Sequence, residues 1–471
     1  MSAIMKASAT AHLQDMGASP GEAGSTGRIS RGREPIGFDI REPAAYADRN
    51  AAAGTRMTAI PIYDDLPVEP DAILEQIFDA AGREGNLVRL YHQLRNVAPI
   101  HQSQIERLGR PWVLTRHSDA AWAAREKGLI KDGRLVDQLG GDPNSPFVTV
   151  MKRMMNFIPA PRHTRLRHLI NPGFTQRTVE RLRPGVRTHI QELIDTRLAD
   201  GQMDLVRDFA YQVPLAMICE LIGVPFEDTH RIEVWSRGVL ESVDEVAIVT
   251  PEMEERRNDA IFGFSGYFQS LIDARRADPK EDLISRLVEV QRGASDLTDE
   301  DIIATLILLF QAGHDTTTSL IAKGMLALLQ HPTELAKLRA RPDLLKNATE
   351  ELLRFDTPVQ LSINHADEDI AYHDQTIQEG EAVLILRGAA NRDPERFPDP
   401  DRLDIEREDI EHHSFGLGAH FCLGASLARL EIQEAIGALT QRIPGMQVDL
   451  EKVEYRPSLH LQGLDALPVT W

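Results

Sequence analysis

The chain contains the segment FGLGAHFCLG at residues 415–424, and this segment decides how the rest of the sequence is interpreted. Its glycines allow tight backbone turns around Cys422, so that backbone N–H groups can point at the sulfur. A helix predicted to begin at about Gly424 places the cysteine at its positive end. Both effects favour a thiolate, and a thiolate beside the apolar Phe415 suits a soft metal or haem iron.

Two other interpretations of this segment stay open on the residues alone. A lone cysteine is commonly a buried structural residue. A dinucleotide-binding loop is disfavoured, because Gly416 and Gly418 lack the third glycine and no predicted strand precedes them. The second cysteine of the chain, Cys219, lies in an apolar helical stretch typical of core. Two cysteines are too few for a disulfide scaffold, a four-thiolate Fe–S cluster or a cysteine-rich zinc module.

A long helix predicted over residues 298–330 carries a second motif. Thr298 can cap its N-terminus, the acidic residues that follow favour its positive end, and a proline at position 332 stops it. Its centre reads AGHDTT, in which the small Ala312 lets a flat cofactor approach the backbone. The pair Asp315 and Thr316 is costly in an apolar helix unless it is solvated or used. The alternative is a helix kink, with the threonine bonded back to a carbonyl.

The remaining sequence predicts a mainly α protein with small β-sheets. Residues 1–37 show no apolar period and read as a disordered extension, whereas 38–471 read as one domain. Apolar residues at three-and-four spacing predict helices at 181–198, 211–221, 256–275, 343–355 and 424–442. Strands are predicted at 112–115, 382–386 and 459–462.

Composition excludes several classes of protein. The 471 residues carry a net charge of −20, which disfavours binding to nucleic acid or to an anionic membrane surface. No apolar run approaches the roughly 20 residues of a membrane anchor, and no secretory signal is visible. We therefore expect a soluble, cytoplasmic protein.

With these motifs in this order, residues 38–471 resemble the cytochrome P450 superfamily, in particular its soluble bacterial haem-thiolate monooxygenases. The resemblance implies haem b, buried between the long helix and the cysteine loop, with Cys422 as axial iron ligand. It implies that Asp315 and Thr316 deliver protons for oxygen activation. The cofactor-binding residues that it implies are Cys422, His163, Arg167, His420, Phe415, Gly416, Gly424 and Ala312.

The resemblance also assigns a structural network and contains one departure. Glu351 and Arg354, three apart on a helix, would form a buried network with Arg402 behind the haem. By spacing alone they are an ordinary surface pair. Related bacterial proteins carry a propionate-binding arginine where this chain has Asn364, and His365 would replace it only if the register shifted by one residue. That position stays unassigned.

The substrate pocket is only weakly defined by the sequence. Candidate lining residues are Leu308, Gln311, Val359 and Leu461, although an apolar stripe is as often plain core. Gln311 would hydrogen-bond a polar group on an otherwise apolar substrate, or else turn away toward another helix.

The expected activity is insertion of one oxygen atom from O₂ into a small or medium hydrophobic molecule. Because the chain has neither a nucleotide-binding fingerprint nor cysteines for an Fe–S cluster, a separate ferredoxin and ferredoxin reductase would supply electrons. The alternatives are a peroxygenase or isomerase-type relative, which would usually lack the acid–threonine pair, and a non-enzymatic haem sensor.

Overall fold

The computed structural model describes residues 63–80, 85–244, 249–293 and 296–471. The expected extension at 1–37 and the domain boundary at 38 lie outside these residues. The helices are α2 Pro70–Phe78, α4 Leu87–Val97, α5 His117–Ala123, α6 Arg134–Gln138, α7 Pro146–Met151, α8 Arg162–Ile170, α9 Gln176–Arg197, α10 Gln212–Ile222, α11 Thr229–Asp244, α12 Pro251–Ala277, α13 Leu283–Arg292, α14 Asp299–Gln330, α15 Pro332–Ala340, α16 Leu345–Phe355, α17 Arg387–Ala390 and α18 Ala425–Arg442.

The strands form four small sheets. They are β1 Ile100–Gln102, β2 Trp112–Leu114, β3 Leu129–Ile130, β4 Gln202–Asp204, β5 Leu361–Ala366, β6 Ile370–Tyr372, β7 Gln375–Ile377, β8 Ala382–Leu386, β9 Gln447–Val448, β10 Glu454–Tyr455, β11 Leu464–Ala466 and β12 Pro468–Thr470. One sheet has the order β1-β2-β8-β5-β3, and the others are β4-β12-β9, β10-β11 and β6-β7. The predicted mainly α class with small sheets is confirmed.

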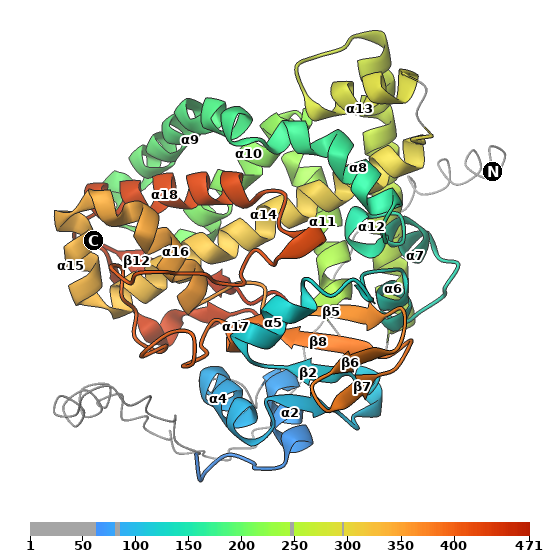
Figure 1. Cartoon of the computed structure of the whole chain (residues 1–471). Coiled ribbons are helices and arrows are strands. Elements are labelled where there is room, and N and C mark those ends of the chain that lie inside the picture. The colour runs from blue at the N-terminus through green and yellow to red at the C-terminus, as the bar shows by residue number, and fades with distance from the viewer. Residues whose placement is uncertain (1–62, 81–84, 245–248, 294–295) are drawn as a thin grey trace, which may run out of the picture. The chain divides into compact units, whose positions relative to one another are not determined.

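Helix α14 is the predicted long helix, and it passes between α10 and α18 (Figure 1). Thr298 caps it, as expected: its hydroxyl accepts from the N–H of Asp301, whose carboxylate accepts from the N–H of Thr298. The first part of α14, up to Phe310, packs in one apolar core. The part from Leu320 onward packs in another. The polar motif at 312–317 therefore lies between two cores.

Other predicted elements differ from the structure mainly at their ends. Helices α9 and α12 each begin five residues before the predicted start, because Thr175 and Thr250 cap them. Both hydroxyls accept from backbone N–H groups of the first turn, which satisfies donors that the helix leaves free. The strand predicted at 459–462 is wrong: only an isolated bridge joins Leu461 to Val359 there.

Candidate functional site

The loop before α18 folds tightly around Cys422. The N–H of Cys422 donates to the carbonyl oxygen of Phe415 at 2.8 Å, which closes the loop. Gly416 and Gly418 have φ of +66° and +67°, a region that side chains rarely adopt. A Cβ at Gly418 would also overlap the carbonyl oxygen of Ala124. The glycines are thus required by the turns, as the sequence indicated.

Two opposing effects act on the thiol of Cys422, and the N–H of Gly424 acts in the expected direction by favouring the thiolate. Burial raises the pKa of Cys422, and this effect outweighs the N–H of Gly424 and the cations Arg387 and Arg167, which act in the opposite direction. A metal cation at the sulfur would reverse this balance, since coordinated thiols are deprotonated.

Helix α8 brings two predicted cofactor-binding residues to the cysteine loop. The ring of His163 lies 4.1 Å from that of His420, centroid to centroid. Arg167 donates from Nη2 to the carbonyl oxygen of Phe421 at 2.6 Å. His163 is buried, and its Nε2 has no hydrogen-bond partner among the described residues. Buried donors are normally satisfied, so this nitrogen points to a partner that the polypeptide does not supply.

Three further basic residues, which the sequence analysis missed, lie close to this group. Burial, together with the charges of Lys131, His163, Arg167 and Arg387, lowers the pKa of His420 to about 3. Burial likewise lowers the pKa of His460 to about 4, with Arg387 and Lys131 contributing. Lys131, Arg387 and His460 come from separate elements, and no short motif links them. Only the fold brings them together.

These donors fit a haem. Lys131, Arg387 and Arg167 are only partly buried, although burial lowers the pKa of each. That combination is typical of side chains around an enclosed space. No carboxylate pairs with any of the three among the described residues. A cationic wall beside the partly buried thiol of Cys422 suits a ligand that carries both a metal cation and carboxylates.

The centre of α14 faces open space within an otherwise buried helix. Ala312 is exposed and Gly313 and Thr316 are partly buried, while the following residues, Thr317 to Leu320, are buried. The hydroxyl of Thr316 donates to the carbonyl oxygen of Ala312 at 2.9 Å. A threonine at a helix kink would make the same bond, so the local geometry agrees both with a kink and with a role of Thr316 in proton delivery.

Asp315 is buried and faces two basic side chains. Its carboxylate lies 3.8 Å from Nδ1 of His314 and 4.0 Å from Nη1 of Arg456. Arg456 belongs to the C-terminal segment that also carries His460 and Leu461. A Cβ at Gly463 would lie 2.6 Å from Oγ of Ser319, so this segment packs against α14. This segment therefore connects Asp315 in α14 to the basic cluster, by which we mean Lys131, Arg387, Arg167 and the histidines beside them.

The pocket candidates divide into two groups. Leu308 and Val359 are partly buried; Leu308 packs against an apolar core, and Val359 bridges the buried Leu461. Gln311, by contrast, donates from Nε2 to the carbonyl oxygen of Ser236 in α11 at 3.3 Å. The alternative of a glutamine turned toward another helix is the one observed.

The predicted structural network forms, with one member exchanged. The Glu351–Arg354 ion pair is wholly buried at 2.7 Å. Arg402 contributes only its carbonyl oxygen, to Arg354, while its side chain pairs with Asp404. The third side chain is that of Arg407, whose Nε lies 3.1 Å from Glu351. Arg402 therefore takes part in this network through its backbone carbonyl and not through its side chain.

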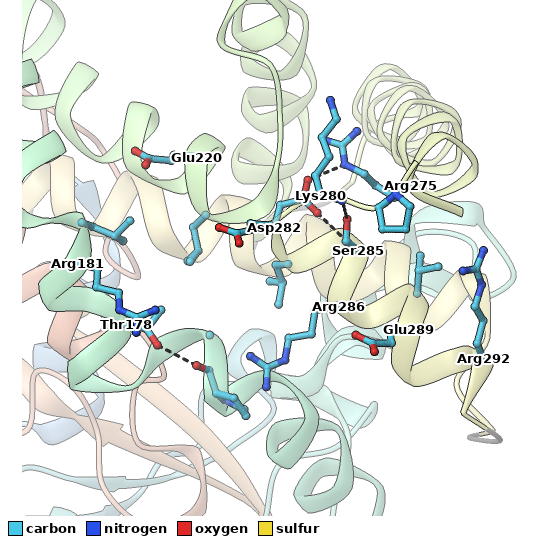
Figure 2. Close-up of a pocket in the computed structure, with 18 residues that line it drawn as sticks. Thr178, Arg181, Glu220, Arg275, Lys280, Asp282, Ser285, Arg286, Glu289 and Arg292 are labelled. Carbon is cyan, nitrogen blue, oxygen red and sulfur yellow. Dashed lines mark hydrogen bonds and ion pairs between the residues drawn. The ribbon is translucent and has the colours of Figure 1, made fainter. Parts of the chain in front are cut away.

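A separate surface cleft of about 730 Å³ lies between α9, α10, α12 and α13 (Figure 2). Its walls carry charges of both signs, including Arg181, Glu220 and Glu289, and Arg275 pairs with Asp282 at 2.6 Å. No predicted site residue lines it, so it is not the candidate site. Among the described residues, no helix has the length and apolarity needed to cross a membrane.

Comparisons with known proteins agree with this arrangement. The family model described as Cytochrome P450 matches residues 143–442. Polyketide biosynthesis cytochrome P450 PksS of Bacillus subtilis is 35% identical over 80% of this chain and 94% of its own length. Vitamin D(3) 25-hydroxylase of Pseudonocardia autotrophica is 39% identical over 81% of this chain and 92% of its own. The crystal structure of P450BioI with an acyl carrier protein superposes with a TM-score of 0.78 at 35% identity, covering 83% of this chain and all of that one.

Proposed function

The chain belongs to the cytochrome P450 family and is a P450 monooxygenase, and from this premise we propose that it uses haem b, held by Cys422, to oxygenate a hydrophobic organic molecule. The observation that carries the proposal is the partly buried Cys422, which lies beside basic side chains that have no acidic partner among the described residues. His163, Arg167 and His420 would bind the haem carboxylates, and the loop residues Phe415, Gly416 and Gly424 would enclose the sulfur.

The reaction needs two electrons and two protons for each oxygen molecule. Substrate, O₂, two electrons and two protons give hydroxylated substrate and one water. The bound haem would supply oxygen activation, and its thiolate ligand favours O–O cleavage. Asp315 would pass protons inward from the surface, and the oxygen of the Thr316 hydroxyl would accept a hydrogen bond from a proton-carrying water in the space beside Ala312. Bonding of that hydroxyl to the Ala312 carbonyl fixes its position on the helix.

The electrons would come from a ferredoxin and its reductase. Phe421, next to the cysteine, is 38% exposed, and Gly418 and Ala419 beside it are exposed as well. Exposed Arg125 adjoins Ala124, which contacts Gly418, and exposed His168 follows Arg167 on α8. An aromatic side chain with basic neighbours suits an acidic electron-transfer protein, and raising the salt concentration would slow its association.

The substrate would be mainly apolar. Leu308 and Val359, which are partly buried, would offer hydrocarbon surface next to the buried Leu461, and the side-chain amide of Gln311 is hydrogen-bonded to Ser236. The relatives' names concern polyketide biosynthesis and vitamin D(3), which supports an organic molecule rich in hydrocarbon without selecting one.

The optical spectrum of the purified protein, reduced and exposed to carbon monoxide, tests the proposal. A strongly red-shifted Soret band is expected, and Cys422→Ser should abolish it. Cys219→Ser is the matched control, because Cys219 is packed in an apolar core and burial raises its pKa to about 12. A spectrum typical of histidine-ligated haem, or one unchanged in Cys422→Ser, would contradict the proposal.

A further inference from the structure

Neither Asn364 nor its neighbour His365 is available as a cation for the haem. Nδ2 of Asn364 donates to the carbonyl oxygen of Leu129 at 3.5 Å. Successive strand residues project to opposite faces, so His365 points the other way. There its Nε2 lies 3.2 Å from Nε2 of Gln138, and its Nδ1 lies 3.6 Å from Asp132. The position that usually carries the arginine is thus occupied by structural contacts.

Lys131 follows β3 directly, at the position opposite Asn364. β3 and β5 are antiparallel, with Leu129 opposite Ala366 and Ile130 opposite His365. Continuing this register by one residue pairs Lys131 with Asn364. Residues directly opposite in an antiparallel pair project to the same face of the sheet. The chain therefore carries a lysine across the sheet from the asparagine, on the face where the arginine is absent.

Arg387 approaches from the other side of β5. β8 ends at Leu386, opposite Leu361, and Arg387 is the next residue. Its guanidinium lies against the cysteine loop, since a Cβ on Gly416 would be 3.2 Å from Nη2 and 3.6 Å from Cζ of Arg387. The two cations therefore flank β5, and Arg387 reaches the loop that holds Cys422.

Electrostatics indicate that these two side chains require an anion. Burial lowers the pKa of Lys131 to about 7, and the charge of Arg387 contributes. Burial lowers the pKa of Arg387 to about 10, opposed only by Cys422. Among the described residues, neither side chain has an ion pair or a hydrogen bond. Two desolvated cations without an acidic partner are unfavourable unless a ligand supplies the negative charge.

We propose that Lys131 and Arg387 anchor a haem propionate in place of the arginine that is absent at Asn364. The assignment rests on the proposed haem cofactor. Lys131, Arg387 and Arg167 together provide three cationic side chains for the two haem propionates and the thiolate. Related proteins carry the propionate-binding arginine on the strand that corresponds to β5, whereas in this chain the two cations follow the ends of β3 and β8.

The rate at which the holoprotein loses haem to an excess of apomyoglobin tests the assignment. Lys131→Met and Arg387→Met should each lose haem at least about tenfold faster, as expected when a charge-assisted hydrogen bond is removed. Lys127→Met is the matched control, since Lys127 is exposed just before β3. Arg387→Lys, which keeps the charge, should lie between Arg387→Met and wild type.

Two further measurements separate propionate binding from a structural role. Asn364→Arg should restore slow haem loss to Lys131→Met, because it returns a cation to the same face. In protein reconstituted with haem dimethyl ester, whose propionates are neutral, Lys131→Met and wild type should lose the cofactor at equal rates. Unchanged haem loss in both methionine variants would overturn the assignment. It would also be overturned if Asn364→Arg failed to slow haem loss in Lys131→Met and if Lys131→Met still lost the dimethyl ester faster than wild type. Wild-type protein without a thiolate-haem spectrum would instead contradict the proposed function.

Discussion

The carboxylate of Asp315 lies 4.0 Å from Nη1 of Arg456, and the same guanidinium lies 3.3 Å from Asp465 through its Nε. Asp315 is buried, whereas the side chain of Asp465 is 49% exposed. Arg456 therefore connects an interior carboxylate to one that solvent reaches.

This relationship predicts that Asp315→Asn slows product formation without changing haem binding. A positioned acid–base group contributes on the order of 10²-fold or more, so the variant should lose about that much turnover with surrogate ferredoxin and reductase. Its solvent isotope effect should rise, since proton delivery becomes slower. Asp465→Asn, which removes only the exposed partner, should stay within about threefold of wild type. Equal turnover in Asp315→Asn and wild type would remove Asp315 from the proton path.

Thr316→Ala is predicted to uncouple electron use from product formation. The variant should consume reducing equivalents but release more hydrogen peroxide and less product, because the hydroxyl oxygen that would hold a proton-carrying water beside Ala312 is lost. The matched control is Thr318→Ala. Thr318 makes the same type of bond, to the carbonyl oxygen of His314 at 3.1 Å, but is buried. Thr318→Ala should alter stability alone, and a peroxide yield equal in the two variants would assign Thr316 to helix packing.

The buried charge network predicts an order of stability among three arginine variants. Arg354→Met leaves the buried Glu351 with Arg407 as its remaining cationic partner, and it should still cost about 3–5 kcal/mol because the wholly buried bidentate pair is lost. Arg407→Met should cost less, because that side chain is 10% exposed and Arg354 still pairs with Glu351. Arg402→Met should be near neutral, within about 0.5 kcal/mol, since its side chain is 60% exposed. Thermal inactivation half-lives measure this order, and a cost at Arg402 equal to that at Arg407 would contradict it.

Much of the fold and site could be predicted because the signals are local. The capped helix α14 and the glycine turns around Cys422 depend on neighbours within a few residues. The strand predicted at 459–462 failed since an apolar run does not specify a pairing partner. Arg407 was missed for a similar reason: Arg402 matches the motif, but which arginine reaches Glu351 depends on the path of the loop.

The basic cluster could not be predicted from local pattern. Lys131 and Arg387 lie 256 positions apart in the chain numbering and become neighbours only through the pairing of β3, β5 and β8. The absence of an arginine at Asn364 was visible in the sequence, but the compensating cations require the register of two strand pairs. Long-range pairing is the information that single-sequence patterns lack.

Glu431 gives a prediction about pH. Both of its carboxylate oxygens are buried without a hydrogen-bond partner among the described residues. Burial raises its pKa well above the ordinary 4.5, so the folded protein holds it protonated where the unfolded chain would ionise it. Its contribution to stability is therefore complete below pH 4.5 and decreases as pH rises toward the folded-state pKa.

Glu431→Gln should remove this dependence, because glutamine resembles the protonated side chain. Between pH 4.5 and the folded-state pKa, wild type should lose up to about 1.4 kcal/mol per pH unit relative to the variant. Thermal unfolding of both proteins between pH 5 and pH 9 measures the difference, with Gln433→Ala on the same helix as a control that changes no titratable group. Parallel curves for wild type and Glu431→Gln would show that Glu431 ionises normally, and a variant that becomes relatively less stable as pH rises would reverse the predicted sign.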